Sequence, residues 1–99
     1  MRAHDLAVLQ EVQDAVVVYE QQRAGRGARF LAELEATLQR IREAPLSWPR
    51  TAIVRHPSIR KAKVMRFPYA VFFYLLRGEP IVVAVAHGRR RQGYWRKRL

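Results

Sequence analysis

The feature that most constrains the fold is a pair of apolar segments joined by a turn sequence. The segments are residues 69–76 and 81–86, and Arg77-Gly78-Glu79-Pro80 stands between them. Short runs that are rich in β-branched and aromatic residues and bounded by Gly and Pro are typical of buried strands. We therefore expect a β-hairpin at the centre of the fold, with the rest of the chain arranged to cover it.

A further strand is predicted just before this hairpin, at residues 60–67. Its side chains alternate, so Ala62 and Val64 would share one face of the sheet, and the other face would carry Lys61, Lys63, Met65 and Phe67. Pro68 lies between this segment and residues 69–76, so the two segments form either one long bent strand or two strands joined at a tight corner. An additional short strand is predicted at residues 51–55.

The N-terminal half has the pattern of two helices. Apolar residues recur at helical spacing at Leu9, Val12, Val16 and Tyr19. Asp5 can cap a helix that begins at Leu6 and ends near Gln22 or Arg23, because residues 24–27 are rich in turn formers. A second helix is predicted over residues 28–43, ending before Pro45. Together these patterns predict an α+β fold in which an N-terminal helix hairpin packs on a small antiparallel sheet, as a single domain over residues 1–99.

The chain is strongly basic, and its charge is concentrated in one half. The formal net charge is +11. Residues 1–49 hold six basic and seven acidic residues, whereas residues 50–99 hold 13 basic residues and a single acid, Glu79. Such a one-sided field predicts an anionic partner, either nucleic acid or an acidic protein, with plain solubility as the alternative.

Several classes of protein are disfavoured by composition. The sequence has no cysteine, so disulfides and thiolate metal sites are absent, and its three histidines lie far apart. We expect no metal and no cofactor. No apolar run approaches the roughly 20 residues that span a bilayer, and no signal peptide is visible, so we expect a cytoplasmic protein without membrane contact.

Several short motifs follow one another along nearly the whole chain. They are Tyr19-Glu20, Gly25-x-Gly27-x-Arg29-Phe30, Trp48-Pro49, Arg66-Phe67-Pro68-Tyr69, Ala84-Val85-Ala86-His87 and Tyr94-Trp95. In this order they resemble the RelE/ParE superfamily of toxins from bacterial type II toxin–antitoxin systems, many of which serve in plasmid stabilization. The resemblance implies that the partner is a cognate antitoxin. The expected assembly is a hetero-oligomer with this antitoxin or a homodimer of the toxin. Such toxins usually open with a strand before the first helix. Here that strand is expected to be shortened or missing, which would leave an open sheet edge for a partner.

The resemblance implies one of two activities. RelE-like members cut messenger RNA in the ribosome without a metal and give 2′,3′-cyclic phosphate ends, whereas ParE-like members poison DNA gyrase. Lys61 and Lys63 resemble the lysine pair of the nucleases, and Arg89 resembles their phosphate-stabilising arginine. The match is incomplete, because Ala70 stands where the nucleases have an arginine. Their late tyrosine, a base or stacking group, aligns more nearly with Trp95, and the adjacent Tyr94 is the candidate for that catalytic role.

Two further groups are candidates from their chemistry alone. His87 directly follows a buried strand and can act as a general acid or base, or can simply satisfy a backbone group at the strand end. Cations interleaved with an aromatic suit phosphate contact and base stacking; the residues are Arg90, Arg91, Trp95, Arg96 and Arg98. The alternative for Trp95 is a place in the core.

These observations predict a toxin that inhibits growth when it is free of its antitoxin. ParE-like action on DNA gyrase is favoured, because the nuclease residues are incomplete. The alternatives are a ribosome-dependent mRNA endoribonuclease and a non-toxic basic binding module that acts with its antitoxin in repression.

Overall fold

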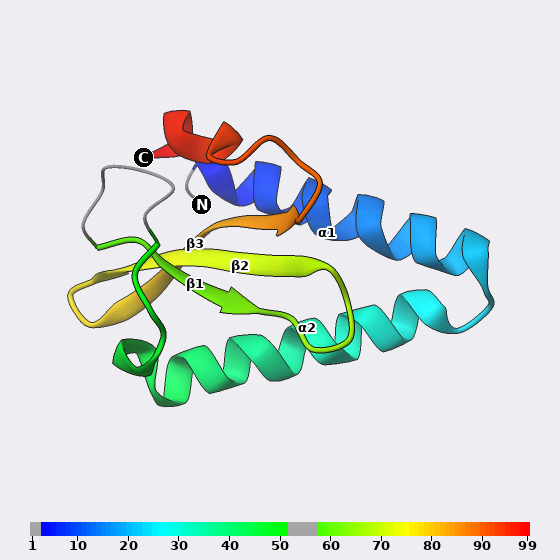
Figure 1. Cartoon of the computed structure of the whole chain (residues 1–99), viewed down its shortest axis with the longest axis horizontal. Helices are drawn as coiled ribbons and strands as arrows, with labels where there is room; N and C mark the ends of the chain where they lie inside the picture. Colours follow the sequence, from blue (N-terminus) through cyan, green and yellow to red (C-terminus); the bar gives the residue numbers. More distant parts are fainter. Residues whose placement is uncertain (1–2, 52–57) are drawn as a thin grey trace.

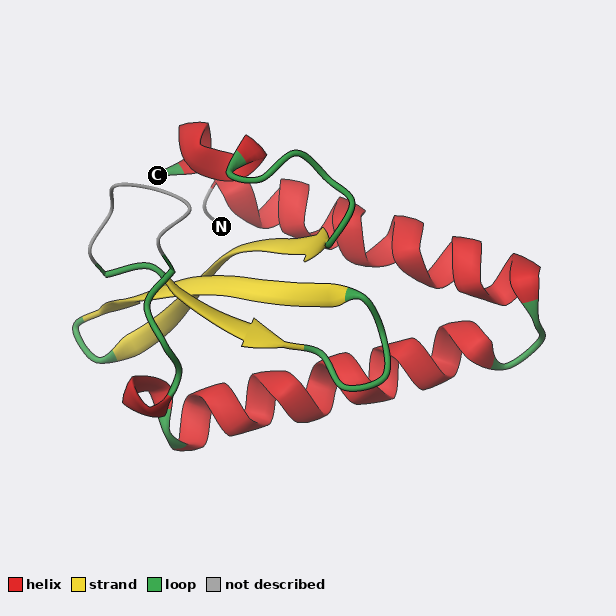
Figure 2. Ribbon diagram, in the orientation of Figure 1, coloured by secondary structure: helices red, strands yellow, loops and turns green. Residues whose placement is uncertain are grey.

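The computed structural model describes residues 3–51 and 58–99. Two long helices, α1 (Ala3–Gln22) and α2 (Arg26–Glu43), are followed by a 3-10 turn, η1 (Pro45–Ser47). Three strands then follow, β1 (Arg60–Lys63), β2 (Tyr69–Leu76) and β3 (Glu79–His87), and the chain ends in a second 3-10 helix, η2 (Tyr94–Arg98). The strands form one antiparallel sheet in the order β1-β2-β3, on which α1 and α2 pack (Figure 1, Figure 2). The predicted α+β class is confirmed, and in the described part of the chain no strand precedes α1.

The element boundaries differ from the prediction in four places. Strand β3 begins at Glu79 and ends at His87, whereas residues 81–86 were predicted. Helix α1 begins at Ala3 rather than Leu6, so Asp5 lies in its first turn, where a carboxylate favours the helix dipole. Helix α2 begins two residues early, after Gly25, which adopts a left-handed conformation with φ of 88°. Strand β1 ends at Lys63 instead of residue 67. The short strand predicted at residues 51–55 falls largely outside the described residues.

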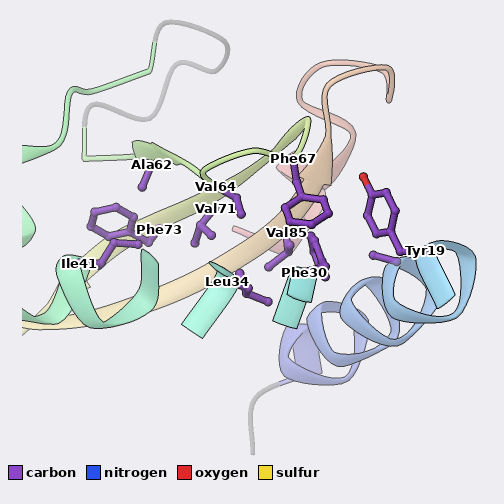
Figure 3. Close-up of a cluster of buried hydrophobic side chains, with 11 residues drawn as sticks. Tyr19, Phe30, Leu34, Ile41, Ala62, Val64, Phe67, Val71, Phe73 and Val85 are labelled. Carbon is purple, nitrogen blue, oxygen red and sulfur yellow. The ribbon is translucent and has the colours of Figure 1, made fainter. Parts of the chain in front are cut away.

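Phe67 lies on the opposite side of the sheet from its predicted position. The chain turns after Lys63, with Arg66 in a left-handed conformation at φ of 69°, and so strict alternation ends there. Phe67 is buried against the helices, and its ring centroid lies 4.9 Å from that of Tyr19 and 5.2 Å from that of Phe30 (Figure 3). Its expected place beside Lys61 and Lys63 was therefore wrong, because the pattern assumed a strand that continued to residue 67.

Both faces of the central hairpin are buried, which explains its unbroken apolar runs. One face packs on the helices through a cluster that includes Leu34, Ile41, Val71, Phe73 and Val85 (Figure 3). The other face carries a second cluster, formed by Ile59, Ala70, Phe72, Val83, Ala84, Ala86 and Trp95. An irregularity between Phe72 and Phe73 inserts Val83 as an extra residue, so Val83 and Ala84 both join the second cluster.

The two outer edges of the sheet are not open along their full length. On the β1 side the connector pairs with the strand, where Lys61 N donates to Pro49 O at 3.1 Å. On the β3 side, Val85 N donates to Glu11 Oε1 at 3.0 Å and Arg98 donates to Val83 O at 3.0 Å. Glu11 and Arg98 are themselves an ion pair at 3.1 Å. Side chains from α1 and η2 thus occupy backbone groups that an additional strand would otherwise use.

Gly27 allows α2 to approach the backbone of α1. A Cβ atom at this position would lie 2.7 Å from Val16 O and 3.1 Å from Val16 Cγ1. The carboxylate of Glu20 fixes the same turn, because it accepts hydrogen bonds from Gly25 N at 2.9 Å and Gly27 N at 3.1 Å. The helix hairpin therefore depends on the absence of a side chain at residue 27.

We predict that Gly27→Ala lowers the free energy of unfolding by about 1–3 kcal/mol, because the added methyl group meets backbone rather than a movable side chain. Urea denaturation measures the change. Gly88→Ala is the matched control: its Cβ would meet Pro68 O at 3.6 Å, an ordinary contact, and should change stability by less than about 0.5 kcal/mol. Equal effects of the two substitutions would contradict the close approach.

Candidate anion-binding site

A pocket of about 340 Å³ lies between the face of the sheet that points away from the helices and the segment that follows β3. We call it the anion pocket. It brings together candidates that are more than 30 positions apart in the sequence; those that line it are Lys61, Lys63, His87, Arg90, Arg91, Tyr94 and Trp95. Arg89, Arg96 and Arg98 do not line it. Most of the predicted site residues therefore line one pocket, and three of them lie outside it.

The charge of the anion pocket is positive. Lys61 and Lys63 project from β1 as exposed side chains, while Ala62 between them is buried in the core, so the predicted alternation holds over this stretch. Arg90 and Arg91 are exposed on the loop after β3. No carboxylate is among the residues described as lining the pocket. Four cations around one concavity create a potential that attracts phosphate or carboxylate groups.

His87 makes a local contact with the backbone. Its Nδ1 accepts a hydrogen bond from Arg89 N at 2.9 Å, and its ring packs edge-on against Tyr69 with centroids 5.0 Å apart. An accepting Nδ1 has no proton, so the neutral ring carries its proton on Nε2. The remaining nitrogen is then a donor, and His87 must release the Arg89 amide before Nδ1 can take a proton from a substrate.

Tyr94 is held by a carboxylate from α1. Its hydroxyl donates a hydrogen bond to Glu11 Oε2. Burial raises the pKa of Tyr94 far above 10, and the hydrogen bond and charge of Glu11 raise it further, while Arg90 and Arg98 act in the opposite direction. The guanidinium carbon of Arg90 lies 3.9 Å from the centre of the Tyr94 ring. Tyr94 therefore positions Arg90, and its hydroxyl cannot serve as a base near neutral pH.

Two of the predicted target-binding residues have structural roles. Trp95 is only 1% exposed and stacks on Phe72 with ring centroids 4.7 Å apart, so its alternative place in the core is confirmed and it cannot stack on a base. Arg98 is held by Glu11 and by Val83 O. Arg89 and Arg96 remain exposed, and Arg96 Nε donates to Gly93 O at 3.1 Å.

Glu11 is the residue that the sequence pattern did not single out. Its side chain is only 11% exposed, although glutamate side chains are mostly exposed in folded proteins. The available signal is its spacing, because Val8, Glu11, Val12 and Ala15 fall at helical intervals on one stripe, and the three apolar residues pack on the core. A carboxylate on a buried stripe indicates that a hydrogen-bond or ion-pair partner lies beside it in the folded protein.

No group of three or more potential metal ligands occurs among the residues that the structure describes. None of the described helices is long and apolar enough to cross a membrane. The chemistry that the four cations of the anion pocket offer is recognition of an anion by lysine and arginine side chains.

The raised pKa of Tyr94 predicts a change in stability at high pH. A tyrosine whose folded pKa exceeds its unfolded value keeps its proton longer in the folded state, so the free energy of unfolding falls as pH rises above about 10. Tyr94→Phe removes this contribution and should make the decline shallower by up to about 1.4 kcal/mol per pH unit. Urea denaturation at several pH values between neutrality and pH 11 measures it, and parallel curves for the two proteins would contradict the assignment.

A scan against protein-family models finds no model that matches this chain. A search of curated proteins finds no match either. What the protein does is therefore inferred from the chemistry of its own residues and from the motifs in its sequence.

Proposed function

We propose that this protein is a growth-inhibiting toxin of the RelE/ParE type, which acts in the cytoplasm by binding an anionic target. The observation that supports it best is the anion pocket, in which Lys61, Lys63, Arg90 and Arg91 gather without a carboxylate. These cations lie on the segments where the resemblance implies the working residues. DNA gyrase, which operates on DNA, is the favoured target.

The contacts of the two titratable candidates favour binding over cutting. RNA cleavage without a metal needs a base to activate the 2′-hydroxyl and an acid to protonate the leaving oxygen. The Tyr94 hydroxyl is bound to Glu11, and Nδ1 of His87 accepts from Arg89 N. Ala70 also lines the pocket where the nucleases have an arginine. The pocket therefore offers permanently charged groups but no side chain that is available as a base, and this favours binding of the target over its cleavage.

A ribosome-dependent endoribonuclease is the second candidate. The observation in its favour is that Lys61, Lys63 and His87 line the same pocket, as a phosphate-stabilising pair and a proton-transfer group would have to do. In this case His87 would exchange its contact with the Arg89 amide for one with the substrate. The same cationic pocket suits an acidic antitoxin segment as the partner that keeps either toxin inactive.

Induction of the protein alone in bacteria separates these functions. We expect growth arrest, an SOS response and trapped gyrase–DNA complexes, without new mRNA ends. Replacement of Lys61 and Lys63 by alanine should abolish the arrest, because it removes two of the four pocket cations. Replacement of Arg40 and Arg42 by alanine is the control, since it removes the same charge from exposed positions of α2 and should leave the arrest intact.

Each alternative result has a distinct meaning. Ribosome-dependent mRNA ends that disappear with Lys61 and Lys63 would replace the gyrase proposal by the nuclease. Normal growth on induction, with the protein present at the expected level by immunoblot, would contradict both toxic functions and leave the non-toxic binding module.

A further inference from the structure

A second group of cations lies at the turn of the helix hairpin. Arg23 directly follows α1, Arg26 and Arg29 lie in the first turns of α2, and Arg66 lies in the loop between β1 and β2. We call these four residues the arginine cluster. All four are exposed, and they surround a concavity that also touches Ala24, Gly25 and Phe67. None of the residues that the structure describes lines both this concavity and the anion pocket.

The guanidinium groups of the cluster have no anionic partner within the described residues. No ion pair or hydrogen bond of these four side chains occurs there. Glu20, the acidic residue at the same turn, uses both carboxylate oxygens to cap Gly25 N and Gly27 N. Like charges at neighbouring helical positions repel one another. An unpaired cluster of this kind lowers stability unless an external anion binds to it.

Two features fix the positions of Arg26 and Arg66 in the cluster. The guanidinium carbon of Arg26 lies 5.0 Å from the ring centre of Tyr19 and 5.8 Å from that of Phe67, so it is anchored on two core aromatics. Arg66 is held in a left-handed backbone conformation, φ of 69°, next to the buried Phe67. Such strain in a non-glycine residue persists only where the surrounding packing imposes it. The loop therefore presents Arg66 beside the helix turn in a defined position.

The character of the surface indicates what binds there. Phe67 is only 5% exposed, and within residues 3–51 and 58–99 no exposed large apolar side chain lines the concavity. Protein–protein interfaces have an apolar centre, whereas contact with a nucleic acid backbone rests on charge and is formed above all by arginine and lysine. The amides at the start of α2 are not what an anion would meet, because Glu20 already accepts from Gly27 N. The surface is thus suited to phosphates.

We propose that the arginine cluster is a second site, which binds the phosphate backbone of a nucleic acid without regard to sequence. Arg66 and Phe67 line the concavity of the cluster, while the next two residues, Pro68 and Tyr69, line the anion pocket. The two cationic sites therefore adjoin at the loop between β1 and β2. The proposal does not depend on which target the anion pocket takes.

Salt-dependent binding tests this site. The probe is a short fluorescein-labelled oligouridine, and fluorescence anisotropy gives the affinity over a series of salt concentrations. The cluster variant combines Arg23→Ala, Arg29→Ala and Arg66→Ala, and keeps Arg26 because of its ring contacts. The control combines Arg40→Ala, Arg42→Ala and Arg50→Ala, which are also exposed and lie at or beyond the end of α2 opposite to the cluster. Both variants remove three positive charges.

We expect the cluster variant to bind at least about tenfold more weakly at low salt, with the slope of log K against log salt reduced by about 2, roughly 0.7 for each phosphate that is no longer neutralised. The control should change the slope by less than about 0.7. Equal weakening in the two variants would mean that net charge alone drives binding, and would overturn the proposal. A cluster variant that still binds oligouridine normally but no longer binds polyglutamate would also overturn it, because the ligand would then be an acidic protein.

Thermal unfolding verifies that the variants are folded. We expect them to be folded because the replaced side chains are exposed. The single substitutions Arg23→Ala and Arg66→Ala provide an independent measurement, with an expected slope change of about 0.7 each. An unchanged slope in both single variants would overturn the proposal whatever the triple variant does.

Discussion

The carboxylate of Glu11 joins three parts of the chain that are far apart in sequence. Its Oε1 accepts hydrogen bonds from Val85 N of β3 and from Arg98 of η2, and its Oε2 accepts from the Tyr94 hydroxyl. A largely buried carboxylate is stable only with such partners, and its partners are equally dependent on it. The contact holds η2 on the sheet, covers the edge of β3 and fixes Tyr94 in the wall of the anion pocket.

This arrangement links stability to the kind of chemistry that the pocket can perform. Tyr94 is tied to Glu11 and supports Arg90 with its ring, so the residue stabilises a cation instead of transferring a proton. Trp95, its neighbour, fills the second core. Among the accessible positive charges, Lys61, Lys63, Arg90 and Arg91 gather at the anion pocket, and the arginine cluster surrounds a second concavity, across the loop between β1 and β2. We infer that the surface binds anions at two adjacent sites, the anion pocket and the arginine cluster.

Local patterns were enough to predict the strands of the central hairpin and the two helices, because their apolar periodicity reflects burial that the fold does provide. Phe67 was misplaced because β1 ends at Lys63, and the turn that follows is imposed by packing against Tyr19 and Phe30. The roles of Glu11 and Arg98 were missed, since their contact joins positions 87 residues apart. Periodicity along the chain places Glu11 on the buried stripe of α1, but it does not identify the residue that pairs with it.

Amide hydrogen exchange at Val85 tests the role of Glu11 most directly. The Val85 amide donates to Glu11 instead of to a neighbouring strand, so protection of this amide reports the carboxylate contact itself. We predict that Val85 is protected in the native protein and that Glu11→Ala accelerates its exchange by about tenfold to a hundredfold more than that of amides between β2 and β3. Glu35→Ala, at an exposed position of α2, should leave Val85 unchanged. Rapid exchange of Val85 in the native protein, or no response to Glu11→Ala, would contradict the account.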